Sequence, residues 1–153
     1  MALNVGDDAP DFDLPASPTG DRFKLGDCRG KNAVIINFAP AAFSPLCSNQ
    51  ASQIERLRSQ FEGQEAVPVI ISSDGAWAQK AWKEQLGIEF PVLSDAFPQG
   101  ATAKAYGVLI ESRGIANRAV FVVGKDGKIA YAHVPATPID MPDYDPVLAC
   151  SKD

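Results

Sequence analysis

The sequence predicts an α/β fold in which a central mixed β-sheet carries helices on both faces. Two continuous apolar runs, 33–39 and 67–72, indicate buried strands, and a segment with helical periodicity follows each of them. Two later apolar runs, 119–123 and 129–133, flank the turn segment 124–127 and predict an antiparallel hairpin. Because parallel strands need crossover helices, the first two strands form the parallel part of the sheet and the hairpin forms the antiparallel part.

The N-terminal third predicts a short hairpin and a long helix. Residues 10–14 alternate apolar and polar side chains, and residues 22–25 offer a partner strand across the turn-rich segment 15–20. From Leu46 onward, apolar residues recur on one stripe of an amphipathic helix that ends near Gly63.

The middle of the chain predicts a second helix and two shorter elements. Asp74 is expected to cap the second helix, and Gly87 suits the left-handed position after its last turn. Residues 90–93 predict a short extended piece, and residues 101–106 a short helix that Gly107 stops.

The C-terminal tail, at about 135–153, is rich in proline, so we expect it to be irregular with only a short helix following. The order is then an N-terminal hairpin, β-α-β-α, an antiparallel hairpin and a short helix. This order is typical of a thioredoxin-like fold with an N-terminal hairpin extension. We expect one domain over residues 1–153, because this length suits one hydrophobic core.

Composition excludes several classes of function. The formal charge of −5 argues against a nucleic-acid or anionic-membrane surface. No apolar stretch is long enough to span a bilayer, and the N-terminal residues are acidic where a signal peptide needs basic ones. We therefore expect a cytoplasmic protein with neither nucleic acid nor membrane as a partner.

The cysteines and histidine predict neither a disulfide framework nor a metal site. Cys28, Cys47 and Cys150 are few and scattered, and His133 is the only histidine. The chain also lacks the glycine-rich loops that bind nucleotides, so we expect no cofactor.

Cys47 stands where a buried strand turns into a helix. Ser44 is a favoured N-cap residue and Pro45 a favoured first helical residue, which places Cys47 in the first turn. There its sulfur faces unpaired backbone N–H groups and the positive end of the helix dipole. Both favour the thiolate, so the sequence predicts a nucleophilic cysteine.

Four segments resemble the peroxiredoxin family. Pro40, Ser44 and Cys47 match the motif Pro-x-x-x-Thr/Ser-x-x-Cys. The segments Pro10–Leu14, Phe90–Asp95 and Gly114–Phe121 match other family signatures, the last of which contains Arg118. The sequence Gly-Ile-Ala-Asn-Arg at 114–118 and the short C-terminus most resemble the one-cysteine alkyl hydroperoxide reductase E subgroup.

The resemblance implies a thiol-dependent peroxidase. It makes Cys47 the nucleophile that attacks hydrogen peroxide, alkyl hydroperoxides and also peroxynitrite, and leaves a sulfenic acid on the sulfur. Arg118 and the Cys47 backbone N–H would hold sulfur and peroxide, the Ser44 hydroxyl would exchange a hydrogen bond with the peroxide, and Pro40 would form an apolar wall. An external thiol or redoxin would reduce the product.

The resemblance also implies a homodimer built through the loops around the active-site cysteine. Phe43, beside the nucleophile, and Phe97 are apolar residues of such loops and are candidates for burial there.

Three positions depart from the family pattern. Gln50 replaces the usual Glu three residues after the cysteine, although its side-chain oxygen could still orient Arg118. Ser52 stands where one subgroup has a second cysteine, and the tail aligns with nothing. Cys150 therefore stays open as a resolving cysteine, and the one-cysteine resemblance favours an external reductant.

Simpler interpretations stand beside these. Without the resemblance, Arg118 is interpreted as a surface arginine. A second interpretation makes Ser44 only a helix cap, and we expect Cys28 to be inert and Trp77 and Trp82 to be packing residues. Two other functions are a thiol–disulfide oxidoreductase, which the absence of a Cys-x-x-Cys pair disfavours, and a non-enzymatic peroxide sensor or binding module.

Overall fold

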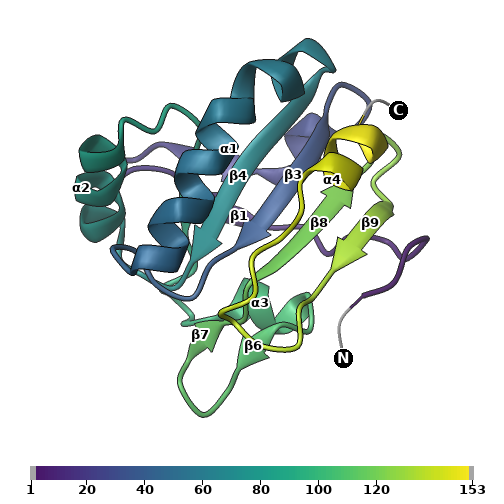
Figure 1. Cartoon of the computed structure of the whole chain (residues 1–153). Coiled ribbons are helices and arrows are strands. Elements are labelled where there is room, and N and C mark those ends of the chain that lie inside the picture. Colours follow the sequence, from purple (N-terminus) through teal and green to yellow (C-terminus); the bar gives the residue numbers. More distant parts are fainter. Residues whose placement is uncertain (1–2, 152–153) are drawn as a thin grey trace.

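The structure, a computed structural model, describes residues 3–151 and has a five-stranded mixed sheet at its centre (Figure 1). The strand order is β5-β4-β3-β8-β9. β3, β4 and β5 are parallel, β8 is antiparallel to β3, and β9 is antiparallel to β8. The strands are β3 (Ala33–Phe38), β4 (Ala66–Ser72), β5 (Val92–Ser94), β8 (Ala119–Val123) and β9 (Ile129–His133). The predicted mixed sheet is confirmed.

Alternation along the fully buried β3 separates the core into two layers. Val34, Ile36 and Phe38 point to one face of the sheet, whereas Ala33 and Ile35 point to the other. The first face is covered by the N-terminal hairpin, the 3-10 helix and a short helix, which are β1 (Asp13–Pro15), β2 (Arg22–Lys24), η1 (Leu25–Cys28) and α3 (Ala101–Ala105). The second face is covered by α1 (Pro45–Gly63), α2 (Ala76–Leu86) and α4 (Asp145–Cys150).

Several local predictions differ from the structure. The N-cap of α2 is Gly75, with no side-chain cap, so the prediction that Asp74 caps this helix is wrong. Trp82 is fully buried as expected, but Trp77 is 68% exposed and does not pack in the core. A hairpin of two very short strands, β6 (Leu109–Ile110) and β7 (Ile115–Ala116), was not predicted.

The tail is irregular as predicted, but it is tied to the core. After β9, the chain returns over the sheet on the side of α1 and ends in α4 (Figure 1). Tyr144 and Val147 are buried in the same layer as Cys47. The tail is therefore part of the wall around the first turn of α1.

The register of the sheet positions the candidate site. Phe38, the last residue of β3, lies opposite Ala119, the first residue of β8. Arg118 thus lies beside the point where the chain leaves β3 for α1. Within residues 3–151, no helix has the length and apolarity needed to cross a membrane.

Candidate active site

Cys47 lies in the first turn of α1, as the sequence predicts. Ser44 is the N-cap, and its hydroxyl oxygen accepts a hydrogen bond of 3.3 Å from the Cys47 backbone N–H. Pro45 is the first helical residue, and the first turn contains no acidic residue. Cys47 has no exposed surface. The sulfur is thus held out of contact with solvent at the positive end of a 19-residue helix.

Arg118 is the cation of this site. Its Nη2 donates to Cys47 Sγ across 3.4 Å, and its side chain is buried, with only 2% of the residue exposed. The surface interpretation of this arginine is therefore wrong. A guanidinium placed beside a sulfur stabilises the thiolate and presents further N–H donors to an incoming oxygen.

Gln50, one turn after Cys47, holds the other side of the guanidinium. Its Oε1 accepts from Arg118 Nη1, so the structure brings together the two residues that the sequence analysis linked. Its Nε2 donates to the Tyr144 hydroxyl across 3.1 Å. Because an arginine only donates, the amide oxygen of Gln50 must be the atom that faces it.

The tail supplies the third contact of Arg118. The Nε atom of Arg118 donates to the backbone carbonyl of Pro138, in the tail, across 2.8 Å. The sequence pattern predicts neither this contact nor the hydrogen bond between Gln50 and Tyr144. The available signal was that Tyr144 is the only aromatic residue after His133, in a stretch otherwise rich in proline.

The loop between β3 and α1 is held in place by a hydrogen bond to Asp74, a residue outside the loop. Pro40, partly buried, begins this loop, and Phe43 adopts a left-handed backbone conformation with φ of 70°. Such a conformation costs about 1–2 kcal/mol for a residue with a side chain. Asp74 accepts hydrogen bonds of 2.7 Å from both the Ala42 N–H and the Ser72 hydroxyl. Asp74 therefore fixes the cysteine loop instead of capping α2.

The Cys47 backbone N–H differs from expectation in one respect. The family resemblance implies that this N–H contacts the sulfur and the peroxide, but in the structure it donates a hydrogen bond to the Ser44 hydroxyl oxygen. The Ser44 hydroxyl keeps its own proton for another acceptor, because it uses only a lone pair here.

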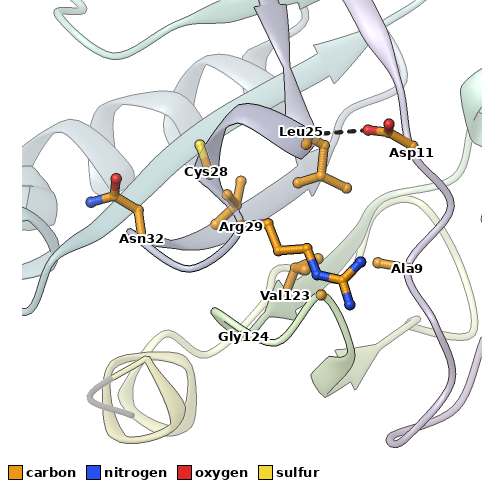
Figure 2. Close-up of a pocket in the computed structure, with 11 residues that line it drawn as sticks. Ala9, Asp11, Leu25, Cys28, Arg29, Asn32, Val123 and Gly124 are labelled. Carbon is orange, nitrogen blue, oxygen red and sulfur yellow. Dashed lines mark hydrogen bonds between the residues drawn. The ribbon is translucent and has the colours of Figure 1, made fainter.

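Cys28 lies at the opposite end of β3 from Cys47. It lines a cavity of about 120 Å³ with ten other residues, which include Asp11, Arg29 and Asn32. Figure 2 shows that its sulfur and the Arg29 guanidinium point away from one another. Burial and the neighbouring Asp27 raise the pKa of the Cys28 thiol, which makes it a poorer nucleophile.

Cys150 also lies far from Cys47. It borders a hollow formed by the turn after β8, at Gly124 and Lys125, whereas Cys47 contacts the residue before β8. Six residues of extended chain, from 118 to 124, span about 20 Å. A disulfide requires Cα atoms within about 7 Å, so the structure does not bring this pair together.

Among residues 3–151, no group of three or more potential metal-binding side chains comes together. The side chains of the site offer a sulfur nucleophile, a guanidinium and a hydroxyl.

The chain is similar to known proteins over most of its length. The model of the AhpC/TSA family matches residues 5–132. Alkyl hydroperoxide reductase E of Mycobacterium tuberculosis is 39% identical over 132 residues, which are 86% of each chain. A thiol peroxidase of Staphylococcus aureus is 30% identical over 150 residues, 98% of this chain and 88% of its own.

The fold has close structural relatives as well. A peroxiredoxin-like protein from Aquifex aeolicus superimposes with a TM-score of 0.87 at 28% identity, covering 99% of this chain and 88% of its own. Family match, sequence relatives and structural relative all point to thiol-dependent peroxide reduction. The chain belongs to the AhpC/TSA family and is a peroxiredoxin.

Proposed function

We propose that Cys47 is the nucleophile with which this peroxiredoxin reduces hydrogen peroxide, alkyl hydroperoxides and peroxynitrite. The observation that carries the proposal is the placement of Cys47 Sγ in the first turn of α1, with Arg118 Nη2 at 3.4 Å. No other cysteine in the described chain has a helix N-terminus and a guanidinium beside its sulfur.

The reaction needs no group beyond these side chains. The thiolate attacks one peroxide oxygen in line with the O–O bond, an S–O bond forms, and the O–O bond breaks. The electron pair leaves with the second oxygen, as hydroxide from hydrogen peroxide, as alkoxide from an alkyl hydroperoxide or as nitrite from peroxynitrite. Hydroxide and alkoxide then take a proton from solvent. Cys47 is left as a sulfenic acid.

Three residues lower the barrier by holding the reacting atoms. Arg118 stabilises the negative charge that moves from sulfur to the leaving oxygen, since its N–H donors are already oriented. The Ser44 hydroxyl can donate to the peroxide, because its lone pair alone is used by Cys47 N–H. Pro40 adds a wall with no N–H to compete.

We propose an external thiol or redoxin as the reductant, because neither Cys28 nor Cys150 lies near Cys47. The same distance argues against a thiol–disulfide oxidoreductase, which needs a second cysteine beside the first. We also propose a homodimer that uses the loops around Cys47 and buries Phe43 and Phe97, which are 51% and 94% exposed.

The test is the rate of peroxide consumption by single-cysteine variants, followed by stopped-flow. Cys47→Ser should abolish the reaction, and Cys28→Ser should leave it unchanged. Full turnover by the Cys47→Ser protein would refute the proposal. A slow rate in the unsubstituted protein, equal to that of a free thiol, would instead favour the sensor or binding module.

A further inference from the structure

A chain of buried hydrogen bonds leads from the Cys47 sulfur to the central sheet. Arg118 contacts the sulfur and Gln50, and Gln50 donates to the Tyr144 hydroxyl. That hydroxyl donates to Asn37 Oδ1 across 2.6 Å. Asn37, on the α1 face of β3, donates from Nδ2 to the Val69 and Ile35 carbonyls at 3.0 and 3.3 Å.

The direction of every bond in this chain is determined by chemistry. Arg118 can only donate, so Gln50 Oε1 accepts and Gln50 Nε2 must donate. Backbone carbonyls can only accept, so Asn37 Nδ2 donates and Asn37 Oδ1 must accept. The group between the two amides must accept from one and donate to the other, and a tyrosine hydroxyl does both.

From this chain, we infer that Tyr144 is a positioning residue for peroxide reduction, because it fixes Gln50 and through it the Arg118 guanidinium against Cys47 Sγ. The inference rests on the proposed roles of Cys47 and Arg118. Tyr144 has no contact with the sulfur and acts only through Gln50. It belongs to the tail, beyond residues 5–132 that match the family model.

The position of Tyr144 suits this role. Tyr144 is 2% exposed and packs in the same layer of the core as Cys47. Burial raises the pKa of its hydroxyl, so the group stays neutral and keeps its proton at any working pH. Without the hydroxyl, Gln50 Nε2 and Asn37 Oδ1 would both be buried without a partner, and Gln50 would be free to turn away from Arg118.

The first test compares two matched tyrosines. Tyr106 is also fully buried, and its hydroxyl donates to the Pro10 carbonyl across 2.7 Å, in the other layer of the core. Tyr144→Phe should slow the peroxide reaction about tenfold or more, because a small displacement of a catalytic donor has a large effect on rate. Tyr106→Phe should lower the melting temperature without a comparable loss of rate.

The second test asks whether Tyr144 acts through Gln50. Gln50→Met removes the amide that links Tyr144 to Arg118 and should slow the reaction by a similar factor. Adding Tyr144→Phe to Gln50→Met should then slow it no further, and this double variant leaves no unpaired amide nitrogen beside the ring. The double variant therefore keeps the test valid if Tyr144→Phe alone does not fold.

Three outcomes would overturn the inference: Tyr144→Phe with an unchanged rate, Gln50→Met with an unchanged rate, or a further loss when the two are combined. Any of these with an inactive Cys47→Ser protein would leave the proposed function intact. An active Cys47→Ser protein would refute the proposed function itself.

Discussion

Cys47 and Arg118 meet although 71 positions separate them in the chain. The setting of Cys47 is local, since the cap, the proline and the strand before it are neighbours in sequence, and it could therefore be predicted from the residues alone. Arg118 could be placed only by family resemblance, because its burial depends on the register between β3 and β8. No local pattern distinguishes such an arginine from a surface one.

Removing the Arg118 guanidinium should slow peroxide attack by about a hundredfold or more, the usual effect of losing one oriented donor. The variant is Arg118→Ala, measured by stopped-flow with hydrogen peroxide and with an alkyl hydroperoxide. Arg29→Ala, which changes an exposed arginine in the cavity at the other end of the sheet, is the control. Equal rates for the two variants would show that Arg118 takes no part in the chemistry.

At the scale of helices and strands, prediction succeeded where apolar residues recur with a clear period or where turn and cap residues mark the ends of a segment. The bounds of α1 and the β8–β9 hairpin follow the apolar pattern and its turn residues. The β6–β7 hairpin has strands of two residues, which are too short to show any alternation. Asp74 has the side chain of a cap, but a competing N–H in the cysteine loop, that of Ala42, binds its carboxylate.

The tail shows the limit of composition as a guide. Its prolines indicate irregular structure, which is observed, but they do not tell whether the segment packs. Tyr144, Val147 and the hydrogen bond from the Ser151 hydroxyl to Gln64 hold α4 against the body of the protein. These partners are distant in sequence, so no local pattern predicts them.

The docking of α4 predicts the fate of oxidised Cys47. Cys150 is the last residue of this helix and borders the hollow at Gly124 and Lys125, so α4 would have to detach from the sheet before Cys150 could reach the sulfenic acid. One equivalent of peroxide should therefore give a Cys47 sulfenic acid that a sulfenate reagent traps, as mass spectrometry can determine. A Cys47–Cys150 disulfide as the main product would identify a two-cysteine enzyme instead.

At the scale of the whole molecule, the predicted dimer can be tested through its exposed aromatic residues. Phe97 is 94% exposed and Phe43 51% exposed, and an interface would remove both from water. Sedimentation should show a dimer, and Phe43→Ser should shift the equilibrium toward monomer. Val5→Ser, at an exposed apolar residue of the N-terminal segment, is the control. A monomer at high protein concentration would contradict the dimer.

Because the side chain of Gln50 is neutral, it does not balance the buried positive charge of Arg118. Among residues 3–151, no ion pair joins Arg118 to a carboxylate, so a Cys47 thiolate would be the anion that balances its buried charge. A protonated sulfenic acid is neutral. Oxidation would thus leave a buried cation without a counter-ion, a situation that costs several kcal/mol.

We therefore expect folding and oxidation state to be linked. Protein treated with one equivalent of peroxide should melt at least about 2 °C below the reduced protein. The Cys47→Ser protein should melt at the same temperature before and after treatment. An equal melting temperature for the reduced and oxidised forms of the unsubstituted protein would count against the linkage. If the linkage holds, the oxidised site is the less stable one, so oxidation itself would favour a local opening that exposes the buried sulfur to a reductant.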